Sequence, residues 1–202
     1  PHHGTIGRTV LGDTARGVLN GASCPVLSVA RAHPSSDARP QRIGVAFDHS
    51  PEAQEALVVA CGLAKEHLAH LELVEAVDVG VAPQVWGAQV AAYLDGLVEP
   101  AAEAIGKLAS ELDVPATGTA VKGRVRQVVG DLSTRSDLIV CGSRTWGAPG
   151  RLALGSTADW LIHRSPCPVL IVPRGVHADA GDAELGASAL ADLPETPATR
   201  AG

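Results

Sequence analysis

One segment of 28 residues occurs twice in the chain, and the distance between its copies limits how the chain can fold. Residues 4–31 align without a gap with residues 147–174, at a constant offset of 143, and about 13 of the 28 positions are identical. An offset of that size is the length of an ordinary single domain. Only three residues precede the first copy, so we expect the chain to open inside one domain and then to contain one complete domain.

Composition divides the chain at the same places. We expect residues 1–31 to be the C-terminal remnant of a first domain, in agreement with the absence of any methionine. Residues 32–41 are rich in proline, serine and charge, which is typical of a linker. We expect residues 42–174 to form the complete domain. Residues 175–202 are rich in alanine, glycine, aspartate and proline without a sustained apolar period, so we expect a disordered tail.

Short apolar runs alternate with helical periods throughout the complete domain. The runs predict buried strands at 43–48, 71–77, 116–121, 137–142 and 168–172. Helices are expected from Pro51 with Ser50 as N-cap, over 90–108 with a possible kink or break at Pro100, over 125–132, and from Thr157. This alternation predicts an α/β fold with a doubly wound, five-stranded parallel sheet of order 3-2-1-4-5, preceded by a helix-strand fragment of a second copy. Since 46% of residues are hydrophobic but only 2% aromatic, the core should be aliphatic.

The expected strand order places a ligand crevice between the first and fourth strands. Chain direction reverses between these neighbours, and doubly wound sheets bind ligands beyond the carboxyl ends of their strands at such a switch point. Asp48 follows the first strand and Gly142 ends the fourth. We therefore expect both residues to border one site.

A glycine-rich loop follows the fourth strand. Gly142, Gly147, Gly150 and Gly155 lie between that strand and a helix that starts with Ser156 and Thr157. Glycine-rich backbone can turn its amides toward an anion, and a helix N-terminus adds partial positive charge, so phosphate is the expected guest. The two hydroxyls could instead only cap the helix. Residues 150–157 also have the outline of a phosphate-binding P-loop, but Ser156 stands where lysine is needed, so efficient phosphoryl transfer is not expected.

Charge and cysteine usage exclude several other classes. A formal net charge of −6 argues against nucleic acid or an anionic membrane as partner, and no apolar run of about 20 residues predicts a membrane span. The four cysteines stand singly in apolar stretches, which favours a reducing, cytoplasmic compartment. His67 and His70 have a spacing that a metal could use, but no further ligands accompany them. We expect a helix end there and no metal.

Four stretches resemble one known family in combination. GVAFDHS at 44–50, SDLIVCGS at 136–143, GRLALGST at 150–157 and SPCPVLIV at 165–172 resemble the universal stress protein family. The resemblance covers residues 42–174, and the first copy resembles the closing third of another such domain. It implies the doubly wound fold, a cytoplasmic location, tandem or dimeric domains and, in one branch, ATP binding through a G-2x-G-9x-G-[ST] pattern.

The resemblance also assigns residues to the nucleotide. The pattern falls on Gly142, Thr145, Gly155 and Ser156. Thr145 replaces the second glycine, and if that position needs a positive φ, the strain costs about 1 kcal/mol or more and weakens ATP binding. Gly147 and Gly150 could let the loop adapt, and Thr157 adds a hydroxyl. Toward the base and ribose the resemblance places Asp48 and the backbone of residues 45–47, which are Val45, Ala46 and Phe47; Asp48 could also only compensate a helix dipole.

These observations lead to a nucleotide-binding regulatory module of the stress response that binds ATP, with or without Mg²⁺, and has no catalytic residue. In the first copy Asp13 stands at the position of Ser156, so that copy should bind no nucleotide. A pyrophosphatase-type enzyme would need a serine- and glycine-rich loop after the first strand, which AFDHSPE is not. The alternative is a protein-interaction or dimerisation module with a vestigial crevice. In either case, residues 24–30 and 168–172 are strands with free edges, and the resemblance implies that they pair antiparallel about a pseudo-twofold axis, within one chain or in a homodimer.

Overall fold

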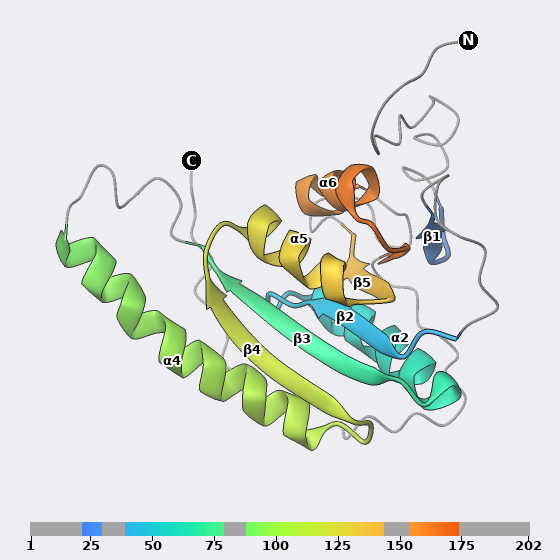
Figure 1. Cartoon of the computed structure of the whole chain (residues 1–202), viewed down its shortest axis with the longest axis horizontal. Coiled ribbons are helices and arrows are strands. Elements are labelled where there is room, and N and C mark those ends of the chain that lie inside the picture. Colours follow the sequence, from blue (N-terminus) through green and yellow to red (C-terminus); the bar gives the residue numbers. More distant parts are fainter. Residues whose placement is uncertain (1–21, 30–38, 79–87, 144–153, 174–202) are drawn as a thin grey trace, which may run out of the picture.

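A six-stranded sheet forms the centre of the molecule (Figure 1). The computed structural model describes residues 22–29, 39–78, 88–143 and 154–173. The spatial order of the strands is β1-β6-β5-β2-β3-β4. In chain order they are β1 (Val26–Ser28), β2 (Arg42–Ala46), β3 (His70–Val77), β4 (Ala116–Lys122), β5 (Leu138–Gly142) and β6 (Val169–Val172). The strands β2 to β6 pair in parallel, which confirms the expected order 3-2-1-4-5.

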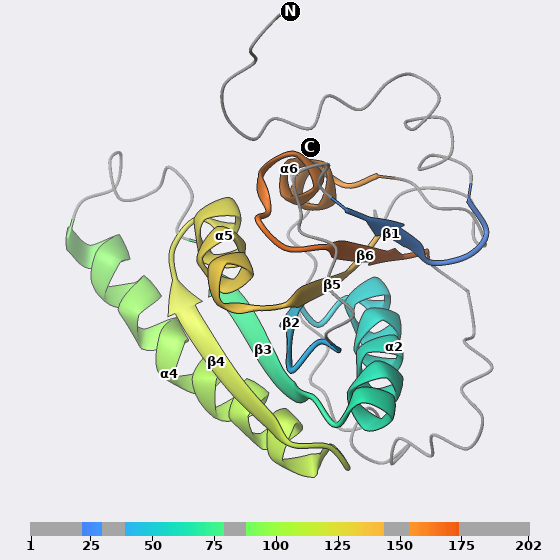
Figure 2. The ribbon, with the colours of Figure 1, turned by 45° about the vertical axis from the view of Figure 1, so that its right-hand side comes forward.

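Two pairs of helices cover the two faces of the sheet (Figure 2). The helices are α2 (Pro51–His67), α4 (Ala88–Glu111), α5 (Val125–Arg135) and α6 (Ser156–Arg164). Buried side chains of α2 and α4 form one core cluster with one face of the sheet, and those of α5 and α6 form a second cluster with the other face. The molecule is therefore an α/β sandwich with helices on both sides of a mostly parallel sheet.

The start of α2 is encoded locally. Ser50 has extended backbone and its Oγ accepts a hydrogen bond from the amide of Ala53 at 3.2 Å, as an N-cap does. Pro51 occupies the first helical position, where its missing N–H costs nothing. This cap decides where the chain leaves β2 and turns back over the sheet, so it also positions the loop between them.

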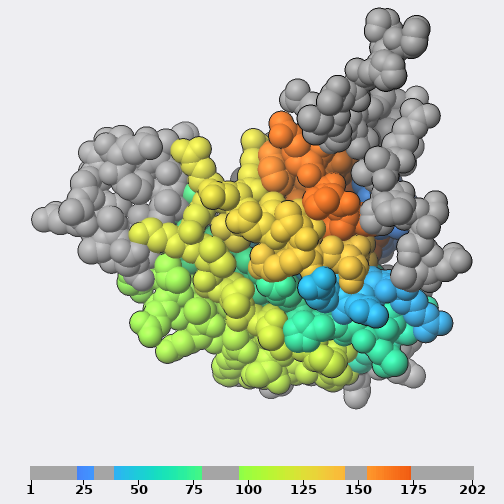
Figure 3. All heavy atoms as spheres, in the orientation of Figure 1, coloured from blue at the N-terminus to red at the C-terminus, as the bar shows by residue number. Residues whose placement is uncertain are grey.

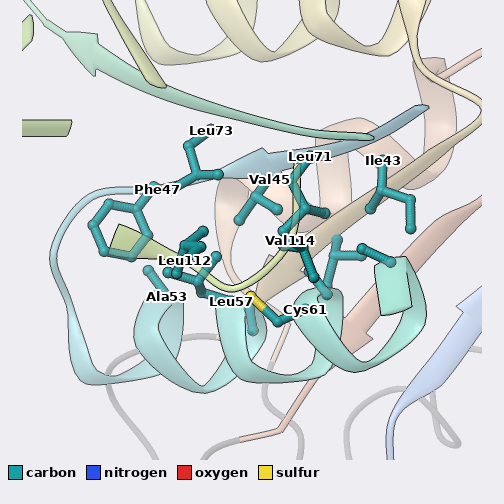
Figure 4. Packing of buried hydrophobic residues seen from close by; sticks show 14 of the residues in the cluster. Ile43, Val45, Phe47, Ala53, Leu57, Cys61, Leu71, Leu73, Leu112 and Val114 are labelled. Atoms are coloured by element: carbon teal, nitrogen blue, oxygen red, sulfur yellow. The ribbon is translucent and has the colours of Figure 1, made fainter. Parts of the chain in front are cut away.

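The core between the sheet and α2 is aliphatic, as the composition predicts. Figure 4 shows side chains of β2 and β3 pointing toward α2, among them Ile43, Val45, Leu71 and Leu73, which are fully buried. On the helix, small residues such as Ala56 and Ala60 face the strands. Small side chains let the helix lie close to the sheet, which compensates for the scarcity of aromatic residues.

Helix α4 is continuous through Pro100, although the sequence left open that Pro100 could break it. Farther along, the helix lies unusually close to β4. A Cβ built on Gly118 of β4 would lie 2.1 Å from the carbonyl oxygen of Ile105. Gly118 therefore sets the distance between α4 and the edge strand. Among the described residues, no helix is both long and apolar enough to cross a membrane.

The strand within the first copy of the repeat lies against the strand within the second copy, as expected. β1 pairs antiparallel with β6, with Val26 opposite Ile171, Leu27 opposite Leu170 and Ser28 opposite Val169. Adding the repeat offset of 143 to 27 gives 170, so the central pair joins equivalent positions of the two copies. The register is consequently symmetric about that pair. Residues 1–21 and the expected tail, 175–202, lie outside the described residues.

Candidate functional site

A cavity of about 320 Å³ lies beyond the carboxyl ends of β2 and β5, on the side of the sheet that carries α5 and α6. These two strands are the neighbours between which chain direction reverses, so the cavity occupies the switch point. The lining comes from three strands and two helices. It consists of Ala46, Phe47, Asp48, Val74, Ala76, Val125, Val129, Cys141, Gly142, Ser143, Gly155, Ser156, Thr157 and Ala158.

The structure brings most of the expected site residues together here. Those that line the cavity are Ala46, Phe47, Asp48, Gly142, Gly155, Ser156 and Thr157. Thr145, Gly147 and Gly150 lie outside the described residues. The resemblance assigned the backbone of Val45 to the nucleotide, and its side chain is not part of the cavity lining. It is fully buried in the cluster on the α2 side, because successive residues of a strand point to opposite faces and Ala46 faces the cavity side.

Asp48 is exposed at the rim and is held by the start of α2. Its Oδ1 accepts hydrogen bonds from the amide of Ser50 at 3.1 Å and from the Ser50 hydroxyl. The same Ser50 hydroxyl oxygen accepts from Ala53 and caps the helix. Asp48 is thus oriented by the helix start while its side chain stays exposed at the rim of the cavity. The carboxylate can serve the helix start and a ligand at once.

The residue after Asp48 clamps the loop to β3. His49 has a φ of 61°, a left-handed conformation in which few residues other than glycine and asparagine are comfortable. Its Nε2 lies 3.0 Å from Oε2 of Glu75, and its ring meets the edge of Phe47 with centroids 4.9 Å apart. The hydrogen bond to Glu75 raises the pKa of His49 above its usual 6.5. The sequence pattern did not point to this pair, because 26 residues separate its members.

At the end of β5, Gly142 is required by close packing. A Cβ on Gly142 would lie 2.6 Å from the carbonyl oxygen of Glu52, in the first turn of α2. The next residue, Ser143, donates its amide to the carbonyl of Val172 at 2.9 Å. Ser143 lines the cavity, and its buried Oγ has no hydrogen-bond partner among the residues that the structure describes. A buried hydroxyl left unpaired is costly, so a polar ligand atom here would be stabilised.

The N-terminus of α6 forms the opposite wall. Gly155 is the N-cap, has extended backbone, and provides no side-chain cap. Its carbonyl accepts the first helical bond, from the amide of Asp159 at 2.8 Å. The backbone N–H groups in the first turn of a helix have no intrahelical acceptor. In α6 this turn contains Ser156, Thr157 and Ala158, which line the cavity. Ser156 and Thr157 also place two side-chain hydroxyls at this wall of the cavity.

An apolar wall completes the cavity, and sequence reasoning missed it. Val74 and Ala76 come from β3, and Val125 and Val129 come from α5. The expected strand order places β3 beside β2, and from this order the sequence could have indicated that residues near the end of β3 line the cavity. Cys141 is also in the wall, but burial raises the pKa of its thiol to about 12, which excludes a reactive thiolate at neutral pH.

Comparison with known proteins agrees with this architecture. Residues 40–173 match the family model described as the universal stress protein family. A universal stress protein from Thermus aquaticus is 31% identical over 136 residues, which are 63% of this chain and 95% of that protein. The chain therefore belongs to the universal stress protein family.

Solved structures show the same fold. Universal stress protein UspA from Lactobacillus plantarum has a TM-score of 0.54 and 25% identity, covering 67% of this chain and 99% of that one. A longer universal stress protein from Archaeoglobus fulgidus has a TM-score of 0.57 and 23% identity, and the match covers 86% of this chain and 59% of that one.

Proposed function

We propose that the chain is a regulatory module that binds an adenine nucleotide, ATP first of all, in the cavity at the ends of β2 and β5. The observation that carries the proposal is the division of the cavity into two chemically distinct walls. One wall is the uncapped N-terminus of α6 with Ser156 and Thr157, and the other is apolar, with Val74, Val125 and Val129. A molecule with an anionic end and a flat, weakly polar end fits such a site.

Each part of the nucleotide has a suitable partner. The first-turn amides of α6 and the two hydroxyls suit phosphate oxygens. The apolar wall suits the faces of an adenine ring. Asp48 at the rim can accept hydrogen bonds from ribose hydroxyls. If Mg²⁺ accompanies the phosphates, Asp48 is the carboxylate within the described lining that could approach it.

We further propose that hydrolysis is absent or slow. Among the described residues that line the cavity there is no lysine, arginine or histidine. A cation that neutralises the charge developing on the transferred phosphoryl group is the main contribution of proteins to that reaction. Asp48, the one carboxylate in the described lining, already accepts from Ser50. We therefore infer that the module regulates through whether ATP occupies the cavity. We also infer a cytoplasmic location, where a reducing environment keeps all four cysteines free.

Isothermal titration with ATP, ADP and AMP, with and without Mg²⁺, tests the proposal. We expect saturable binding, with affinity falling as phosphates are removed, and no release of phosphate over the same period. No binding at millimolar ATP with Mg²⁺ would contradict the nucleotide proposal. Rapid release of phosphate by pure protein would contradict the regulatory one.

A second candidate function rests on a different observation. The symmetric register of β1 and β6 has the form of an isologous contact between equivalent strands. We propose on this basis that the chain also serves as an interaction or dimerisation module, in which a β6 edge pairs with an equivalent strand. If titration shows no nucleotide binding, this candidate becomes the leading one.

A further inference from the structure

A second hollow lies between α5 and α6 on the outer side of these helices, and its volume is about 570 Å³. The two helices lie side by side on one face of the sheet in both ribbon views (Figures 1 and 2). Figure 3 shows their yellow and orange surfaces in contact on one face of the molecule. We call this hollow the α5–α6 groove. Val125 and Val129, on the inner side of α5, line the nucleotide cavity instead.

The α5–α6 groove is basic in a chain that is acidic overall. Arg124, Arg126 and Arg164 line it together with one carboxylate, Asp131, whereas the whole chain carries a formal net charge of −6. In addition, α5 has no acidic residue in its first turn and no side-chain cap, so its N-terminal partial charge adds to the arginines. The local charge is therefore opposite to that of the molecule.

Within the described ranges, these three arginines take part in no ion pair. Arg135, on the same helix, makes a bidentate pair with Glu72 of β3, with Nη2 to Oε1 at 2.6 Å. By contrast, no carboxylate in the described part of the chain lies within ion-pair distance of Arg124, Arg126 or Arg164. Guanidinium groups without an internal partner can bind carboxylates of another molecule through paired hydrogen bonds.

An aromatic ring lies beside the arginines. Trp160 of α6 is half-buried and borders the groove. A Cβ on Gly130 of α5 would lie 2.9 Å from Cη2 of this ring, so the absence of a side chain at Gly130 allows the ring to lie against α5. Tryptophan next to arginine is a common combination at the centre of protein interfaces, because it offers an apolar surface between charged contacts.

From this arrangement we propose that the α5–α6 groove binds a short acidic peptide segment of a partner protein. Its carboxylates pair with Arg124, Arg126 and Arg164, and an apolar side chain packs on Trp160. The groove accommodates only a few side chains. The net charge of −6 opposes an extended polyanion such as nucleic acid more than it opposes a few local carboxylates. This binding is independent of the proposed nucleotide function, since it uses the other side of α5.

The test uses the whole chain and a fluorescein-labelled peptide in which glutamate and leucine alternate, followed by fluorescence anisotropy. A peptide with glutamine in place of glutamate is the charge control. We expect the acidic peptide to bind at least about tenfold more tightly than the neutral one, because charge-assisted hydrogen bonds contribute most of the affinity. Binding should weaken as salt increases.

Variants locate the contact. Arg126→Gln and Arg164→Gln should each weaken peptide binding by about fivefold or more. The matched control Lys107→Gln removes the same charge from α4, on the other face of the sheet, and should change the affinity by less than about twofold. Gly130→Ala should also weaken binding, because the added methyl displaces Trp160. Thermal unfolding of each variant confirms that the fold is retained.

Three results would overturn the proposal. The neutral peptide could bind equally well, Lys107→Gln could weaken binding as much as Arg164→Gln, or an oligothymidylate could bind more tightly than the acidic peptide and so favour nucleic acid. The nucleotide proposal can fail separately. Ser156→Asp, in the cavity, should leave peptide binding unchanged whatever it does to ATP.

Discussion

His49 shows how one residue controls the geometry of the site. Its backbone adopts a left-handed conformation, with a φ of 61°, and its side chain reaches Glu75 on the neighbouring strand. The contact between these two side chains holds the loop that carries Asp48. Both side chains are largely buried, with 16% and 19% of their surface exposed, so solvent screens the pair only in part.

This ion pair makes stability depend on pH. Because Glu75 raises the pKa of His49 in the folded state, the protonated histidine stabilises the fold. The contribution is fully present below the unfolded pKa of about 6.5 and is lost as pH rises through the higher folded pKa. We expect urea unfolding to give a free energy difference between wild type and Glu75→Gln that is larger at pH 5.5 than at pH 8.5. An equal difference at both pH values would show that His49 is not charged in the pair.

Ser156 provides a charge test at the start of α6. Ser156→Asp should weaken ATP binding at least about fivefold, because a carboxylate near the phosphates costs roughly 1 kcal/mol or more at an exposed position. The fold should be retained, since an acidic residue in the first helical turn is favourable. Titration calorimetry measures the effect, and Ser156→Asn is the neutral control of the same shape. If Ser156→Asp binds ATP as wild type does, the phosphates lie elsewhere.

Among the elements, α4 and β4 depend most visibly on a single glycine. Gly118→Ala should lower the free energy of unfolding by about 1–3 kcal/mol, because the new methyl meets the carbonyl of Ile105 and the helix must move. Gly106→Ala in α4 is the matched control. Its Cβ would meet nothing within 4 Å, so it should instead raise stability by up to about 1 kcal/mol through better helix propensity. Denaturant unfolding of both variants measures the difference.

At the scale of the whole molecule, β1 covers an edge that would otherwise be open. β6 pairs with β5 on one side and with β1 on the other. An uncovered strand edge tends to pair with another strand, and the register here already suits an equivalent strand. Leu27 of β1 and Val29, just after this strand, are about half exposed. The edge of the sheet formed by β1 therefore still exposes apolar side chains to solvent.

Deleting residues 1–32 should consequently turn the chain into a symmetric dimer through β6. Light scattering of the shortened protein should give about twice the mass of one chain, and the dimer should dissociate on dilution. The intact chain is the control. A shortened protein that stays monomeric at high concentration would contradict the pairing role that we propose for this edge.

Much of the fold could be predicted because it depends on local patterns. The Ser50 cap, the apolar runs of the strands and the right-handed crossovers were sufficient for the order of the five parallel strands. The same order placed Asp48 and Gly142 at one edge. The antiparallel pairing of β1 with β6 was predicted from the free edges of the two strands together with the family resemblance, and the structure contains it.

The chain's amino-acid pattern by itself determined its class, its strand order and the two ends of its cavity. Tertiary structure alone decided which face each side chain occupies and which distant residues meet. The side chain of Val45 is buried in the core, His49 forms a hydrogen bond with Glu75, and Trp160 packs against Gly130. The physical reason is that strand and helix periods are properties of neighbouring residues. Contacts between elements depend on packing distances that no local pattern contains.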